Sequence, residues 1–448
     1  MCERLHFRIW MSKIQKVTVV TCFLFLTIVG IAFIQPASAE EDSVLNLPFR
    51  FHGFWELAGG LRCGDSRTEH EDYDLLESRF QLKFTYYPEI IPILADWNSS
   101  IFFKADFLVD GFDEEPDGEL REFYLETSPL SFFDVKVGRQ IITWGTGDLV
   151  FINDLFPKDW ISFFIGRDDQ YLKVPSDALK TGFFSPWVNL DVIFIPFFEP
   201  DNPIRGKRLS FFNPFTNKLV GEDAHFYYQR PDRNPESPEF AARLNRFFGS
   251  YETALYGFWG YYKQPAGIKE PLGQRFFYPR LNVYGASIRG PAIGGIIHLE
   301  VGYYLSKEDQ AGNDPLVENS SMKYLVGYER EFWTDFTLGA QYFLNQLLDY
   351  ADYRSSTPSQ SPRRDHYMHL LTLRLTQLLY HQDIELSFFA FYSPSDQDFH
   401  LRPRISYEIS DNWKISLGSN IFGGRDEFTL FGQLKRNDNF YLRIRYSF

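Results

Sequence analysis

The sequence has 448 residues, a formal net charge of −14 and an aromatic content of 18%, with 47 phenylalanines. An acidic chain lacks the basic face that binds phosphate backbones, which argues against nucleic acid as a partner. A soluble protein would have difficulty burying so much aromatic surface, whereas a transmembrane β-barrel turns it toward lipid.

The first 39 residues have the order of a secretory signal peptide. Basic residues between Arg4 and Lys16 precede an apolar run over 17–34, and Ala37-Ser38-Ala39 follows. Basic, apolar and small-residue segments in this order predict export and cleavage after Ala39. The alternative is an uncleaved anchor, because the apolar run nearly reaches the length that spans a membrane. Cleavage would leave residues 40–448 as one domain.

Beyond residue 40, apolar and polar residues alternate along many segments. Near the N-terminus, Phe80, Leu82, Phe84 and Tyr86 alternate with polar residues such as Lys83. Successive side chains of a strand point to opposite faces, so this pattern predicts strands with one apolar and one polar face. The segments have roughly the 9–11 residues that a tilted membrane-spanning strand needs.

The alternation predicts about eighteen strands, within a range of 14 to 18. They cover residues 49–62, 76–87, 99–110, 118–127, 131–139, 177–185, 188–197, 240–248, 251–261, 280–290, 294–305, 320–330, 334–345, 366–379, 383–393, 402–409, 413–423 and 439–448. Short links alternate with long polar segments, which predicts periplasmic turns and extracellular loops. The link 88–98 is longer than such turns usually are. We therefore expect an all-β fold, a transmembrane antiparallel β-barrel, closed because an open sheet edge has no partners in lipid.

The long segment 140–176 is expected to fold into the lumen. Arg139 shares its parity with Val135 and Val137, which should face lipid, but Gly138 allows a bulge that would turn it inward. We hypothesise that Arg139 pairs with an acid of this segment and holds a constriction. An ordinary surface loop is the alternative. The candidate constriction residues are Arg139, Gln140, Trp144, Asp148, Asp154 and Asp159.

Charged residues of both signs fall on the predicted polar faces. A water-filled lumen tolerates them, whereas lipid disfavours Arg or Lys at its midplane by roughly 2–4 kcal/mol. They are expected to set the field and selectivity of a pore; alternatively, they form an ion-pair lattice that stiffens the wall. The candidate pore-lining residues are Lys83, Lys104, Asp106, Glu122, Arg443 and Arg445.

Two motifs resemble a known family. The stretch Gly138-Arg139-Gln140, with Trp144-Gly145 and then Phe151-Ile152-Asn153-Asp154, resembles the G-R-Q…W-G signature of a porin-like family of proteobacterial outer-membrane barrels of unknown function. Phe156-Pro157 stands where Asn-Pro would be typical. The resemblance implies a barrel that passes solutes, sometimes hydrophobic compounds. The terminal Tyr446 and Phe448 match the aromatic signal read by the barrel-assembly machinery.

The expected function is passive passage of small solutes through the outer membrane of a Gram-negative bacterium. Expected partners are outer-membrane lipid, lipopolysaccharide, the barrel-assembly machinery and a small-molecule solute. One alternative is an outer-membrane enzyme, although no nucleophile motif is recognisable. Another is a dedicated transporter of hydrophobic compounds, which the inward Phe389 and Phe391 fit weakly. No cofactor is predicted, and no metal site, because His366 and His369 have helix-like spacing in a strand.

Overall fold

A computed structural model describes residues 49–64, 68, 70, 72–232, 237–270, 275–358 and 361–448. The predicted signal peptide and its cleavage site, within residues 1–39, lie outside the described residues. No helix in the described part of the chain is long and apolar enough to cross a membrane.

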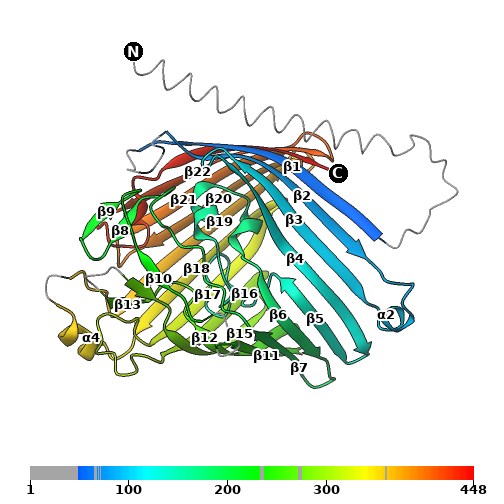
Figure 1. The fold of residues 1–448 in the computed structure, drawn as a ribbon, viewed down its shortest axis with the longest axis horizontal. Helices are drawn as coiled ribbons and strands as arrows, with labels where there is room; N and C mark the ends of the chain where they lie inside the picture. The colour runs from blue at the N-terminus through cyan, green and yellow to red at the C-terminus, as the bar shows by residue number, and fades with distance from the viewer. Residues whose placement is uncertain are drawn as a thin grey trace, which may run out of the picture.

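Eighteen antiparallel strands form one closed barrel, which confirms the predicted fold class (Figure 1). Strands that follow one another around the barrel pair directly, and the first strand closes the circle by pairing with the last. In ring order the strands are β1 (Phe49–Arg62), β2 (Tyr73–Tyr86), β3 (Ser100–Asp110), β4 (Glu115–Leu130), β5 (Phe133–Gln140), β6 (Ser176–Phe183), β7 (Asn189–Ile195), β11 (Glu239–Phe248), β12 (Tyr251–Tyr261), β15 (Arg280–Ala292), β16 (Gly295–Ser306), β17 (Ser321–Trp333), β18 (Phe336–Leu347), β19 (Tyr367–Leu379), β20 (Ile384–Ser393), β21 (Asp398–Glu408), β22 (Trp413–Gly424) and β23 (Asn439–Ser447).

The links between strands divide the barrel into two different ends. Most links at one end, here called the turn end, are short, and the other end, here called the loop end, carries the long segments together with the short links 111–114 and 394–397. The long link between β2 and β3 is at the turn end and contains the short helix α2 (Pro92–Asp96). The loop end carries further short elements, which are β8 (Phe211–Asn213), β9 (Lys218–Val220), β10 (Tyr227–Gln229), β13 (Gly267–Glu270), β14 (Arg275–Phe277) and helix α4 (Tyr350–Ser356).

The two faces of each barrel strand differ in the way the alternation predicts. In β23, Phe440 and Leu442 are exposed on the outside, whereas Tyr441 and Arg443 are buried in the interior. Leu417 of β22 lies opposite Leu442 and is also exposed. Exposing apolar surface to water costs about 25 cal/mol per Å², so this outer surface suits hydrocarbon rather than water.

The C-terminus completes the seam between β1 and β23. The backbone N–H of Phe448 donates to the carbonyl of Gly53, and the N–H of Gly53 donates to the carbonyl of Phe448, both at 3.0 Å. A Cβ atom on Gly53 would lie 2.6 Å from the Phe448 ring, so only glycine fits at this position. The Phe448 ring also contacts Phe51 and Phe80. The assembly role of Tyr446 and Phe448 stays a prediction.

Candidate functional site

The segment 141–175, called the lumen segment below, connects β5 to β6 and folds back into the barrel. Its ends are fixed because Gln140 and Ser176 are register partners on these two strands. Asp159 caps the N-terminus of helix α3 (Trp160–Ile165), and its carboxylate accepts from the Ser162 N–H at 2.9 Å. The helix ends at Gly166, which has a φ of 87° and takes the left-handed cap that favours glycine.

The first half of the lumen segment reaches the wall opposite its origin. Asp148 pairs with Arg374 of β19 at 2.7 Å, and β19 lies nine strands from β5 in either direction around the ring of eighteen. The side-chain amide of Gln341 on β18 accepts from the Asp148 N–H and donates to the Asp148 carbonyl, both at 2.8 Å. The lumen segment therefore spans the interior from wall to wall.

Glu300 on β16 supplies a second anchor for this half. Its carboxylate accepts from the backbone N–H of Thr146 and from that of Gly147 at 2.8 Å. It also accepts from the side-chain amide of Asn153 at 2.8 Å. A buried carboxylate that accepts several N–H donors offsets its desolvation and fixes the loop backbone at the same time.

The second half of the lumen segment is held by arginines of β21 and β23. Asp168 pairs with Arg443 at 3.0 Å and with Arg445 at 3.1 Å, and Asp169 pairs with Arg402 at 2.7 Å. Burial alone would raise the pKa of Asp168, but the two β23 guanidiniums outweigh it and hold the pKa at about 2. The carboxylate is therefore charged over the whole physiological range.

Aromatic packing seals the space between α3 and the wall. Phe163 contacts Phe391 at a ring distance of 6.2 Å, and Phe164 contacts Phe422 at 5.6 Å. The buried His400 ring stacks on Phe422 between them. Phe389 and Phe391, which were considered as a hydrophobic path, are consequently buried and do not line an open surface.

Asp154 and Asp159, both predicted at a constriction, act within the lumen segment itself. Asp154 pairs with Lys158 at 3.1 Å and with Lys173 at 3.0 Å, so it ties together two parts of the same segment. Asp159 caps helix α3. The segment 140–176 folds inward as expected, and of the three predicted acids only Asp148 pairs with a barrel strand. That the segment forms a constriction stays a prediction.

Four lysines gather on the inner face of β2 to β6. Lys83 and Lys104 are direct register partners on β2 and β3, and Lys136 and Lys180 are direct partners on β5 and β6. Glu122 is the register partner of Lys104 on β4. Lys104 also donates to Gln170 of the lumen segment at 3.4 Å. Like charges placed directly opposite each other destabilise a sheet, but Glu126 on β4 is likewise the register partner of Lys136, so each lysine pair has a glutamate beside it.

The other wall residues predicted from the sequence form paired contacts. Asp106 accepts from Arg79 at 2.8 Å and from Gln81 at 2.7 Å. Arg445 pairs with Glu56 at 2.7 Å in addition to Asp168. These groups fit the alternative reading, in which ion pairs stiffen the barrel wall.

The hypothesis for Arg139 is wrong. Arg139 pairs with Asp177 of β6 at 3.4 Å and donates to the Leu120 carbonyl at 2.8 Å, and it contacts no acid of the lumen segment. Its register partner Phe123 is exposed on the outside, so Arg139 belongs to the outer face as its parity indicates. Gly138 does adopt a positive φ of 129°, but Arg139 after it still lies on the outer face of the barrel.

Gln140, the last residue of β5, and Trp144, near the start of the lumen segment, are both buried. Gln140 donates to the Ala178 carbonyl at 3.0 Å, and Trp144 packs against Phe156 and Tyr256. They position the segment rather than face open space.

A second inward contact was missed by sequence reasoning. Arg208, in the long link between β7 and β11, enters the barrel and pairs with Asp110 and, at 3.5 Å, with Glu77. Arg167 of the lumen segment also pairs with Glu77. An arginine inside a long polar segment carries no periodicity, so no sequence signal marked Arg208.

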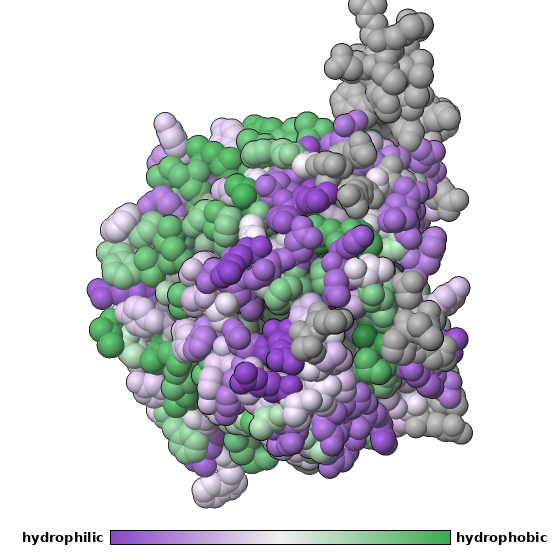
Figure 2. All heavy atoms as spheres, turned by 90° about the vertical axis from the view of Figure 1, so that its left-hand side faces the viewer, coloured by the Kyte–Doolittle hydropathy of each residue, from purple (hydrophilic) through white to green (hydrophobic). Residues whose placement is uncertain are grey.

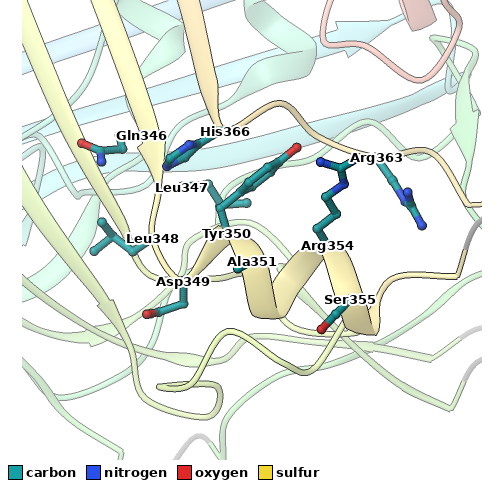
Figure 3. Close-up of a pocket in the computed structure, with 10 residues that line it drawn as sticks. All are labelled: Gln346, Leu347, Leu348, Asp349, Tyr350, Ala351, Arg354, Ser355, Arg363 and His366. Carbon is teal, nitrogen blue, oxygen red and sulfur yellow. The ribbon is translucent and has the colours of Figure 1, made fainter.

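The loop end is polar at its centre. Figure 2 looks onto this end, where hydrophilic residues gather over the middle of the face and hydrophobic residues lie around them. At the rim, an open pocket of about 790 Å³ lies beside α4, where the rings of Tyr350 and His366 stack at 4.8 Å (Figure 3). None of the predicted site residues lines this pocket. Across the described residues, no group of three or more metal-ligating side chains comes together.

No family model and no curated protein matches the sequence. Solved structures do resemble the barrel. OccAB4 of Acinetobacter baumannii has a TM-score of 0.53 and 9% identity, over 90% of this chain and 99% of that one. OccK2 (OpdF) of Pseudomonas aeruginosa in complex with glucuronate has a TM-score of 0.53 and 8% identity, over 89% of this chain and 97% of that one. OccD3 (OpdP) of the same species has a TM-score of 0.52 and 9% identity, over 89% of this chain and 91% of that one.

At these identities the likeness establishes the fold, which is the closed 18-stranded antiparallel barrel of outer-membrane porin structures. The expected resemblance to outer-membrane porins is confirmed at the level of the fold. The narrower link to the family with the G-R-Q…W-G signature stays a prediction.

Proposed function

We propose that the protein is an outer-membrane channel for passive passage of small solutes, and that the lumen segment narrows its route. The observation that carries this proposal is the anchoring of the segment far from β5 and β6, where it leaves the wall. Asp148 pairs with Arg374 on β19, nine strands from β5, and Asp168 pairs with Arg443 and Arg445 on β23. A barrel of 16 to 18 strands encloses an aqueous lumen, and a segment fixed across it reduces the cross-section.

We further propose that the channel prefers small anions, including carboxylates. Among the described residues, Lys83, Lys104 and Lys136 have no carboxylate within salt-bridge distance, and the register partners of Lys83 are His52 and Lys104. The register partners of Lys104 and Lys136 on β4 are Glu122 and Glu126, so Lys83 is the lysine of this group that supports the proposal most directly. Of the similar barrels, OccK2 (OpdF) was solved with glucuronate, a sugar carboxylate. For hydrophobic compounds the support is weaker, because the lumen segment covers Phe389 and Phe391.

Planar-bilayer recording tests both statements. Purified protein should give discrete current steps, and a salt gradient should give a reversal potential of anion-selective sign. The double variant K83Q/K104Q should move the reversal potential toward zero with the step size little changed. A barrel that inserts but conducts no current, or that hydrolyses lipid or peptide substrates, would favour the enzyme alternative instead.

A further inference from the structure

The tips of the links at the turn end carry exposed apolar side chains. Among the described residues, four large hydrophobic side chains are more than 70% exposed: Ile90 at 83%, Trp187 at 73%, Ile293 at 85% and Tyr380 at 76%. All four lie at the turn end, on links that follow one another at four strands, with a gap of six strands from the β19–β20 link back to the β2–β3 link. The other four turn-end links carry exposed apolar residues at or beside the turn, which are Phe132, Phe248, Trp333 and Ile409.

Water-exposed hairpin turns favour Gly, Asn and Asp, because these residues tolerate positive φ and bond to water. Ile293 stands in the link between β15 and β16 with a φ of 51°, followed by Gly294 with a φ of 73°. A β-branched residue in the left-handed region is strained. The turn therefore has the backbone of an Asn-Gly turn but carries an isoleucine that is 85% exposed.

This turn is bonded to the outer surface of the barrel rather than to its mouth. The Ile293 carbonyl accepts from the Tyr328 hydroxyl at 2.8 Å and from Arg330 at 3.4 Å. The Tyr251 hydroxyl donates to the Pro291 carbonyl at 2.7 Å. Tyr328 and Arg330 share their strand face with the exposed Val326, so the turn continues the outward apolar surface.

We propose that the turn tips form a lipid-contact ring, immersed at the boundary between hydrocarbon and headgroups of the adjoining phospholipid leaflet. This inference rests on the proposed membrane location. A ring present on all eight links suits lipid, which surrounds the barrel, better than a protein that docks on one side. Two outward arginines lie beside the ring, Arg246 over Phe248 and Arg330 over Phe332. In the proposed arrangement their guanidiniums are at the level of the lipid phosphates.

The first experiment compares I293N with wild type by urea unfolding in phosphatidylcholine vesicles. Asparagine relieves the backbone strain, so a turn in water would raise the unfolding midpoint. Immersion predicts the opposite, a lower midpoint, because the isoleucine loses its lipid contact. The matched control is H381N, a polar tip residue with a φ of 57°, which should leave the midpoint unchanged. A raised midpoint for I293N would overturn the proposal.

The second experiment measures how deeply individual residues lie in the lipid bilayer. A fluorophore is attached in a C63S background at Ile293→Cys, at Leu299→Cys on the outer belt and at Tyr227→Cys at the loop end; Cys2 and Cys22 lie in the segment expected to be cleaved. Brominated phospholipids should quench positions 293 and 299, and aqueous iodide should quench position 227. Iodide quenching at 293 with lipid quenching at 299 overturns the lipid-contact ring alone. Iodide quenching at 299 overturns the membrane location itself.

Discussion

Single ion pairs decide where the lumen segment is held. The pair between Asp148 and Arg374 is about one-third exposed, so water screens it and its contribution is modest, about 0.2–1 kcal/mol. Asp168 faces Arg443, which is almost fully buried, and Arg445, which also pairs with Glu56. Removing the Asp168 carboxylate takes away the ion-pair partner of Arg443, a cost of about 1–3 kcal/mol. Removing the Asp168 carboxylate should therefore loosen the lumen segment more than removing the Asp148 carboxylate.

The first prediction concerns Asp148. D148N should raise the mean single-channel conductance slightly and increase current noise, because the tip of the lumen segment is released from β19. The matched control is D177N, which breaks the Arg139 pair on the outer face and should change neither quantity. Equal effects of the two variants would contradict this assignment of faces.

The second prediction concerns pH. The pKa of Asp168 is held at about 2, below the ordinary value of 3.8, so its stabilising contribution is complete above pH 3.8 and is lost as the pH falls through about 2. D168N should conduct more than wild type by a constant factor from pH 7 to pH 4. This difference should vanish toward pH 2. A difference that disappears already near pH 5 would contradict the ion-pair account.

The faces of the wall residues could be predicted from the sequence, but their partners could not. Parity correctly placed Lys83, Lys104, Arg443 and Arg445 inside. It also placed Arg139 outside, and the error came from overriding parity with a glycine bulge. Pairing across the lumen depends on the path of a long irregular segment, which has no period to read.

At the level of elements, the barrel strands and the lumen segment follow different rules. All eighteen barrel strands could be predicted because each alternates over many residues. The start of β21 was predicted at residue 402 rather than at Asp398, since Pro403 and the polar residues before it disguise the alternation. The short strands β8, β9, β10, β13 and β14 have three or four residues, too few to show a period.

The third prediction concerns Glu300, which organises the first half of the lumen segment. E300A removes the acceptor of the Gly147 N–H and of the Asn153 amide, so this half should loosen as a unit. Hydrogen exchange of residues 144–153 should accelerate while the exchange of β15 to β17 stays slow. E300Q keeps an acceptor oxygen, so its exchange rates in residues 144–153 should lie between those of wild type and E300A. Faster exchange throughout the barrel would indicate a general loss of fold instead.

At the level of the whole molecule, one apolar surface faces outward and one polar surface faces inward, and the lumen segment divides the interior. Its removal is structurally simple, because Gln140 and Ser176 are neighbours across β5 and β6 and a short glycine-serine turn can join them. No barrel strand depends on the segment for its backbone pairing.

The most direct test of the account is therefore the single-channel conductance of a variant in which residues 141–175 are replaced by such a turn. If the chain is a channel narrowed by this segment, the variant should insert as an intact barrel and its unitary conductance should increase several-fold over wild type. An intact barrel with unchanged conductance would contradict the proposed constriction, and no current from either protein would contradict the channel.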